Sequence, residues 1–209
     1  MTDSVRKQEE KRQNYAALME AIKARLDVVQ FILNNGKTMP LNEDAAQELC
    51  WLQLRMIGET ISAACLLAHD DLQNKRLQGE WNANNIIATL GNLHAEFFPR
   101  PVKREHLADG TIHMNSVPDG FLTRDELLKL IGQAGNKLHI GSLKNLFEKK
   151  PLPQDIWDEI RTWNNKIVLL LQEHFIKFRD NSVYYIALKE AIENNKVLFV
   201  LAAPQAVGL

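Results

Sequence analysis

The chain has 209 residues, a formal net charge of −1, 45% hydrophobic residues and 24% charged residues. This length can form one domain with a sizeable core, and the composition is that of an ordinary globular protein. A net charge near zero disfavours a strongly electrostatic nucleic-acid binder, which usually carries a basic excess. The charged N-terminus is unlike a signal peptide, and no run of about 18 apolar residues is present to span a membrane. We therefore expect a cytoplasmic protein without membrane association.

The first predicted helix covers residues 4–34. Its apolar residues step by three and four from Tyr15 to Leu33, and so form one stripe along the helix. Residues 1–14 are nearly all polar, and we expect this start of the helix to protrude. The Asn35-Gly36 pair marks its end.

The segment 49–69 is apolar or small on nearly every helical face, which predicts a central, enclosed helix. Cys50 and Cys65 lie too far apart along one helix to bridge each other, and two buried thiols suit a reducing cytoplasm. Arg55 and Glu59 interrupt the apolar run and, four residues apart, are neighbours on one face. We expect this pair to be buried, and buried charges require partners.

Short capping patterns predict where further helices begin. Asn42 is the expected N-cap of the central helix, and Asn82 or Asn84 that of a short helix after it. Thr123 and Glu126 have the spacing of a capping box, which predicts another helix start.

Two more helices are expected near the C-terminal half. Ser142 is the predicted cap of one short helical turn. Pro153 suits the first position of a long helix, which we predict to run to Phe178 because its apolar period is the most regular in the chain.

Two segments have the pattern of β-strands. Residues 102–118 form two short arms around Asp109-Gly110, a common signal of a hairpin with a type I′ turn. Within residues 183–202, two β-branched and aromatic runs predict two antiparallel strands. We see no internal repeat or low-complexity linker. The sequence therefore predicts one domain over residues 1–209, mainly α: a helical bundle of about five helices with a small antiparallel β appendage.

The candidate site consists of Arg55, Glu59 and His139. His139 lies in the segment LHIGS, before a predicted helix start, where backbone N–H groups favour anions. In a functional interpretation, Arg55 holds an anion while Glu59 orients His139 or acts as a base. In the structural alternative, the charged pair fixes the packing of the central helix, and His139 makes one structural hydrogen bond. The residues leave both interpretations open.

The other five histidines have structural explanations. His69 and His94 are expected at solvated helix ends, and His106 and His113 are expected to face each other across the hairpin. His174 falls on the apolar stripe of the last long helix, which predicts a core histidine. The chain has no glycine-rich phosphate loop and no CxxC, GxSxG or HExxH motif, so we predict no cofactor and no metal site.

An Arg-x-x-x-Glu pattern within an apolar helix, followed much later by a Leu-His-x-Gly-Ser segment, resembles the helical HEPN-like proteins of bacteria. The matching residues are Arg55, Glu59 and the segment 138–142. The resemblance implies a helical bundle that is often dimeric, and many members cut RNA as toxins or defence proteins. Active members carry an arginine shortly before the histidine on one helix, whereas Arg124 is the nearest arginine before His139 here. The match is therefore closer to the non-catalytic branch.

Three functions follow as hypotheses. The first is an accessory, non-enzymatic component of a defence or toxin–antitoxin type system, acting as a homodimer or through a protein partner. The second is a metal-independent RNase, or another enzyme acting on phosphodiesters, that uses Arg55, Glu59 and His139 on RNA. The third is a small-molecule sensor.

Overall fold

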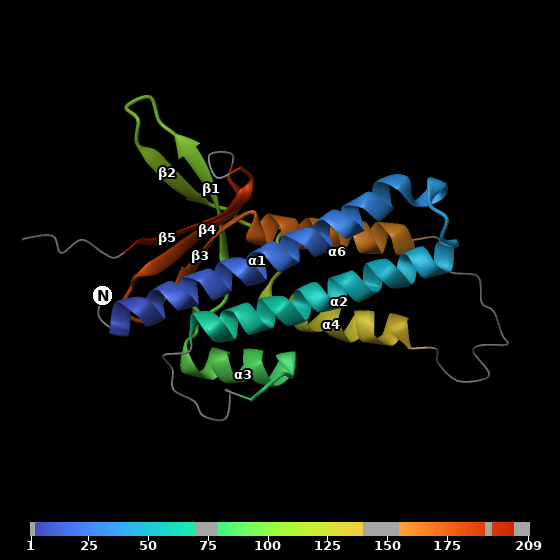
Figure 1. Ribbon diagram of the computed structural model, residues 1–209, viewed down its shortest axis with the longest axis horizontal. Helices are drawn as coiled ribbons and strands as arrows, with labels where there is room; N and C mark the ends of the chain where they lie inside the picture. The colour runs from blue at the N-terminus through green and yellow to red at the C-terminus, as the bar shows by residue number, and fades with distance from the viewer. Residues whose placement is uncertain (1–2, 70–78, 140–154, 191–193, 203–209) are drawn as a thin grey trace, which may run out of the picture.

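The computed structural model describes residues 3–69, 79–139, 155–190 and 194–202. These residues form a mainly α structure with one small antiparallel sheet, which confirms the predicted fold class (Figure 1). In chain order, the elements are α1 (Asp3–Asn35), a 3-10 turn (Gly36–Thr38), α2 (Glu43–Ala68), α3 (Ala83–Leu93), β1 (Arg100–His106), β2 (Ile112–Ser116), α4 (Arg124–Leu138), α6 (Ile156–Leu171), β3 (Glu173–Lys177), β4 (Val183–Glu190) and β5 (Lys196–Ala202).

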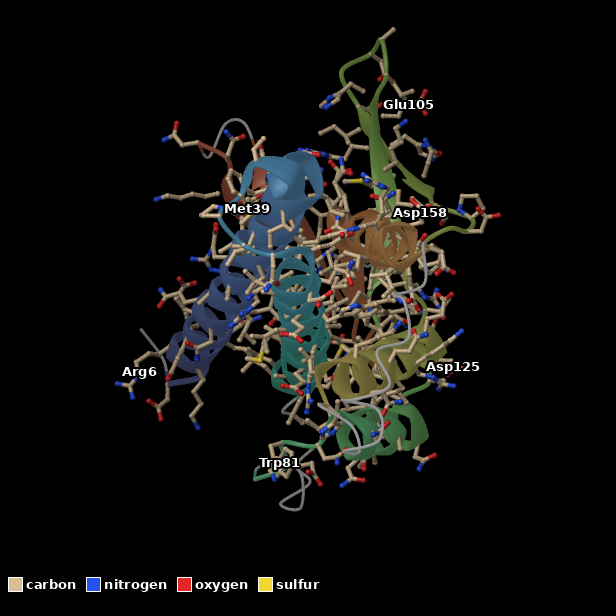
Figure 2. The ribbon with its side chains drawn as sticks, turned by 90° about the vertical axis from the view of Figure 1, so that its right-hand side faces the viewer. Arg6, Met39, Trp81, Glu105, Asp125 and Asp158 are labelled. Atoms are coloured by element: carbon tan, nitrogen blue, oxygen red, sulfur yellow. The ribbon has the colours of Figure 1, made fainter. Side chains whose placement is uncertain are left out.

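The helix α2 is the central element, as its sequence predicts. It packs against α1, α3, α4 and α6, and side chains such as Leu54 and Ile57 are fully buried. Figure 1 shows α1 and α2 side by side, with α3 and α4 next to α2. Figure 2 views the helices close to end-on, with the exposed Trp81 just before α3.

The predicted helix starts are confirmed. The Asn42 side chain accepts a hydrogen bond from the Ala45 N–H, and Asn82 caps α3 in the same manner. At α4, Thr123 and Glu126 form the complete capping box, each side chain bonded to the other's backbone N–H. These caps satisfy N–H groups that a helix leaves without intrahelical partners.

The sheet has the strand order β2-β1-β3-β4-β5, with every neighbouring pair antiparallel. The two predicted strand pairs are confirmed, but they belong to one sheet because β3 lies between them. The prediction of a helix reaching Phe178 was wrong: α6 ends at Leu171, and β3 follows almost at once. Hydrogen bonding to β1 and β4 on both sides outweighs the helical period of this segment.

The first hairpin does not use the predicted type I′ turn. Gly110 N–H donates to Leu107 O at 3.0 Å, and Leu107 N–H donates to Thr111 O at 2.9 Å. Gly110 has φ +84°, whereas Asp109 is not among the described residues with positive φ. This pattern is a type I turn followed by a glycine bulge, the usual form of a hairpin loop with one residue more than the two-residue type.

The main core lies between the helices and one face of the sheet. From α1 it receives the buried side chains of Tyr15, Met19, Ile22 and Val29. A second, smaller cluster on the sheet contains Val102, Tyr185 and Ala187. The segment 3–14, expected to protrude, continues α1 with mostly exposed side chains, although Lys11 lies over the Phe178 ring, 5.8 Å from its centroid.

The predicted helical turn after Ser142 and the predicted helix position of Pro153 lie outside the described residues. Within the described part of the chain, no helix combines the length and apolar character needed to cross a membrane.

Candidate functional site

Arg55 and Glu59 form the ion pair that their spacing predicts. The Arg55 Nε atom donates to Glu59 Oε1 at 2.9 Å. The expectation of an enclosed pair was wrong, because the two side chains are 39% and 36% exposed. The pair lies on the part of α2 that the surrounding helices leave half open, away from the buried Leu54 and Ile57. An ion pair with this exposure contributes roughly 0.3–0.5 kcal/mol on a helix, far less than a buried one.

The helix α4 carries the third predicted residue. A side-chain carbon built on Gly135 would lie 3.6 Å from Arg55 Nη1, so the guanidinium lies directly against this helix. His139 follows Gly135 by four residues, about 6 Å along a helix, and is the exposed C-cap of α4. Among the described residues, no hydrogen bond or ion pair joins His139 to Arg55 or Glu59.

The three residues therefore lie on two adjacent helices without forming a bonded cluster. The Arg55 charge is already compensated by Glu59, and His139 has no carboxylate to orient it within the described chain. The remainder of the LHIGS segment, from residue 140, lies outside the described residues. The exposed imidazole of His139 therefore lies near the guanidinium of Arg55, which is paired with Glu59. These groups lie at the surface and do not form an enclosed reaction site.

The histidine predicted at the end of the central helix is buried instead of solvated. His69 is 3% exposed, and its Nε2 atom lies 3.1 Å from Phe97 O. The rings of Phe97 and Phe178 pack around it, so the prediction failed because these aromatic residues cover the helix end. His94 is half-buried, with Nε2 2.9 Å from Lys177 O.

His174 is a core histidine, as predicted, although it belongs to β3 and not to a helix. It is fully buried, with Nδ1 3.0 Å from Leu171 O and Nε2 3.1 Å from the Tyr15 hydroxyl. The Nδ1–H therefore donates to the carbonyl, and Nε2 accepts from tyrosine. Burial lowers the pKa of His174 to about 4, because the charged imidazolium would lose its hydration.

The hairpin histidines do not face each other. His106 is paired with Ile112, and His113 is paired with Glu105. Because successive residues of a strand point to opposite faces, the two imidazoles lie on opposite faces of the hairpin. Within the described residues, no three His, Cys, Asp or Glu side chains are grouped so that they could hold a metal ion.

A second apolar stripe on α1 was missed in the sequence. Besides the core stripe, α1 carries apolar residues that step by four and three and are all exposed: Ala17, Ala21, Ala24, Val28 and Phe31. We call these five residues the outer stripe. Val28 is 38% exposed and Phe31 56% exposed. The sequence contained this information as a second set of apolar residues spaced by three and four. Because three of the five are alanines, the set is less apparent than the core stripe.

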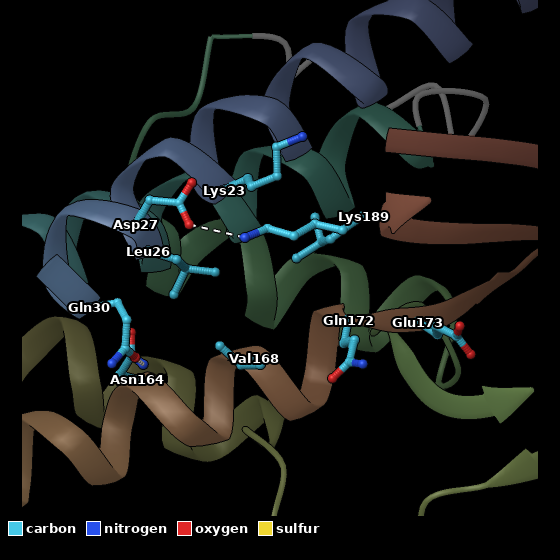
Figure 3. A pocket seen from close by; sticks show the side chains of 10 residues that line it. Lys23, Leu26, Asp27, Gln30, Asn164, Val168, Gln172, Glu173 and Lys189 are labelled. Carbon is cyan, nitrogen blue, oxygen red and sulfur yellow. Dashed lines mark hydrogen bonds and ion pairs between the residues drawn. The ribbon is translucent and has the colours of Figure 1, made fainter. Parts of the chain in front are cut away.

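The second missed feature is a pocket of about 300 Å³ between α1, α6 and the sheet (Figure 3). Its lining residues come from segments more than a hundred residues apart, so no local sequence pattern predicts the pocket. Figure 3 shows Asp27 of α1 and Lys189 of β4 meeting at one side, and the amides of Gln30 and Asn164 lying together at the other.

Comparisons with known proteins give no further identification: no family model, no curated protein and no solved structure matches this chain.

Proposed function

We propose that this protein acts by self-association, as a non-enzymatic helical component that pairs with a second copy of itself through the outer stripe of α1. The observation that carries the proposal is the exposure of all five residues of this stripe. A surface helix normally has one apolar stripe facing its own core, and α1 has two. Contiguous exposed apolar surface of this kind marks association sites in globular proteins.

The spacing of the outer stripe is that of a helix–helix contact. Its steps of four and three reproduce the a and d positions of a heptad repeat. The three alanines permit close approach of a second helix, while Val28 and Phe31 supply larger apolar side chains at one end. The stripe lies on the side of α1 away from Tyr15 and Ile22, which are buried in the main core.

The neighbouring face of α2 extends this surface. Leu52 is 42% exposed and Met56 is half-buried on this face of α2, beside Leu49, which is half-buried and also packs against the main core. Arg25 of α1 donates to Gln53 of α2 at 2.8 Å, which ties the two helices together at their surface. From residue 17 to residue 31 the outer stripe is about 21 Å long at ~1.5 Å per residue, so this face is smaller than the ~800 Å² per partner of a standard interface. A face of this size suits the small interface of a transient, concentration-dependent dimer.

The charges beside the outer stripe favour a second copy in a parallel orientation. In the heptad register of the stripe, Glu20 occupies a g position and Arg25 the following e position. In a parallel pair of helices, a g residue lies opposite the next e residue of the partner, so Glu20 of one copy would lie opposite Arg25 of the other. To pair across the contact, Glu20 would share its carboxylate with Lys23 and Val197 N–H, and Arg25 would share its guanidinium with Gln53. An antiparallel pair would bring Arg25 near its own symmetry mate. Like charges would then meet.

The biological setting proposed from the sequence is a defence or toxin–antitoxin type system, in the non-catalytic branch of HEPN-like proteins. The short matches at Arg55, Glu59 and residues 138–142 support this kinship, and dimer formation suits it. Cys50 and Cys65 are free and buried, which supports a reducing, cytoplasmic compartment.

The experiment is a measurement of molar mass in solution over a range of protein concentrations. We expect the wild type to be a dimer and Val28→Glu/Phe31→Glu to be a monomer, because charges would be placed in the contact. Leu107→Glu/Ile112→Glu is the matched control: it adds the same two charges at residues that are 43% and 51% exposed in the first hairpin, and it should remain dimeric. A wild type that stays monomeric throughout would refute the proposal, as would a dimeric double variant.

A second candidate, cleavage of RNA, is supported by one observation. Arg55 lies against Gly135, one helical turn before the exposed His139, so a phosphate could contact both the guanidinium and the imidazole. Purified protein incubated with single-stranded RNA would cleave it, and His139→Ala would lose the activity while keeping the wild-type circular dichroism spectrum. His113→Ala, at another exposed histidine, should cleave normally. Intact RNA with the wild type would eliminate this candidate.

A further inference from the structure

The pocket between α1, α6 and the sheet has the form of a small-molecule site. Leu26, Val168 and Leu188 give it apolar walls from three different elements. Its volume of about 300 Å³ lies at the lower end of the range for such sites. Polar side chains, among them Gln30, Asn164 and Lys189, stand at the edges of these walls (Figure 3).

The charged residues of the pocket are compensated within the protein. Asp27 pairs with Lys189 at 3.1 Å, and Glu173 binds Arg104 at 2.8 Å. Lys23 pairs with Glu20 and donates to a backbone carbonyl. A ligand with a full charge would have to displace one of these partners, so the pocket favours a neutral ligand.

One buried amide of the pocket lacks a partner. Asn164 is 2% exposed, and its Oδ1 atom accepts no hydrogen bond. In the chain of amides that leads to Asn164, Gln30 Nε2 donates to Asn34 Oδ1 at 3.0 Å, and Gln30 Oε1 accepts from Asn164 Nδ2. That contact is long, 3.4 Å, and Gln30 is exposed, so Gln30 can move aside at little cost.

A buried acceptor without a donor is destabilising, and a bound molecule that supplies the donor removes the penalty. Adenine is a flat, neutral heterocycle that a carboxamide group recognises well. The carboxamide oxygen accepts a hydrogen bond from the adenine amino group, and the carboxamide nitrogen donates one to the adjacent ring nitrogen. When Gln30 moves aside, both the Oδ1 and the Nδ2 atom of Asn164 are available to the ligand. Leu26, Val168 and Leu188 would then enclose the ring.

We propose that this pocket binds a neutral adenine-type base or nucleoside, with Asn164 reading the amino edge and the three apolar residues enclosing the ring. The proposal is independent of the proposed self-association, because the pocket lies on the opposite flank of α1 from the contact with α2 and uses none of the outer-stripe residues.

The test is isothermal titration calorimetry of the full chain with adenosine, inosine and adenosine monophosphate. Adenosine should bind saturably. Inosine replaces the amino group by a carbonyl and should bind at least ~10-fold more weakly, since a bidentate pair of this kind is worth about that factor. The monophosphate should bind no more tightly than adenosine, because the lysines of the pocket are already paired.

Variants separate recognition from stability. Asn164→Leu removes the unpartnered amide and should abolish adenosine binding, whereas Asn136→Leu, at an exposed position of α4, should leave it intact. Circular dichroism checks the fold of both. No saturable binding of adenosine, equal binding of inosine, or unchanged binding by a folded Asn164→Leu would each overturn the proposal. Should Asn164→Leu fail to fold, the adenosine-to-inosine ratio of the wild type still decides it.

Discussion

The buried imidazole of His174 should make the stability of this protein depend on pH above the range where carboxylates titrate. In the folded state its pKa is lowered from 6.5 to about 4, and in the unfolded chain it returns to its ordinary value. Between these values the unfolded chain binds a proton that the folded protein does not. The free energy of unfolding therefore falls as the pH falls from 6.5 to 4.

The magnitude follows from the two pKa values. Each unit of difference corresponds to 1.36 kcal/mol, so the full loss is about 3 kcal/mol, and about 2 kcal/mol of it occurs between pH 7 and pH 5. Carboxylates with lowered pKa values, such as Glu126 and Asp180, remain ionised over most of this window. These carboxylates lose their contribution to the free energy of unfolding only at lower pH. Between pH 7 and pH 5, the change in stability therefore comes from the histidines.

The assay is urea unfolding followed by tryptophan fluorescence at pH 7, 6 and 5. His174→Gln retains polar atoms toward Tyr15 and Leu171 but does not titrate. Between pH 7 and pH 5, the unfolding free energy of the wild type should therefore fall by about 2 kcal/mol more than that of His174→Gln. His113→Gln, at an exposed histidine, is the matched control and should follow the wild type. If His174→Gln follows the wild type as well, the assignment of the pH dependence to this residue is refuted.

Two more predictions concern packing and thiol reactivity. Gly58→Ala should lower the unfolding free energy by about 1–3 kcal/mol, since the added carbon would lie 2.7 Å from Ile131 Cγ1. Gly132→Ala, with nothing within 4 Å, should raise it by up to ~1 kcal/mol, and urea unfolding measures both. Burial raises the pKa of Cys50 and Cys65 to about 12, so a thiol reagent at pH 8 should label them only as fast as the protein opens. Immediate labelling of both thiols without denaturant would contradict their burial.

The helix starts were predictable because their signals are local. A cap such as Asn42 or the box formed by Thr123 and Glu126 satisfies N–H groups within the next three residues, so the necessary information lies in four or five adjacent positions. The strand pairs were also predictable from runs of β-branched and aromatic residues. These features need no knowledge of the rest of the chain.

The segment after α6 was not predictable for the opposite reason. Leu170, Leu171, His174 and Phe178 continue a helical period, and no glycine or proline interrupts it. The strand β3 exists because β1 and β4 each bond to one of its edges, and those partners are distant in the sequence. In this segment, pairing with the distant strands β1 and β4 outweighs the local preference for helix.

The burial of the Arg55–Glu59 pair was predicted wrongly, because the sequence does not determine which way the pair faces. The spacing of Arg55 and Glu59 predicted their contact, but it could not say which face of α2 the helices α1 and α4 would leave open. An apolar run on all faces was interpreted as full enclosure, whereas part of that run, with the exposed Leu52 and the half-buried Met56, lies at the surface. Apolar residues on a free face and in a core look alike in a single sequence.

The joining of the first helix to the last strand has a consequence for synthesis on the ribosome. The backbone N–H of Val197 donates to the Glu20 carboxylate, 177 residues earlier in the chain, and Tyr15 packs edge-on against Phe199. The helical hairpin of α1 and α2 can form early, but Tyr15 gains its contact with His174 only when β3 has left the exit tunnel, and its contact with Phe199 only when β5 has followed. A chain that ends before β5 would lack the Phe199 side of this cover, so the first helix is completed by nearly the last part of the chain to be made.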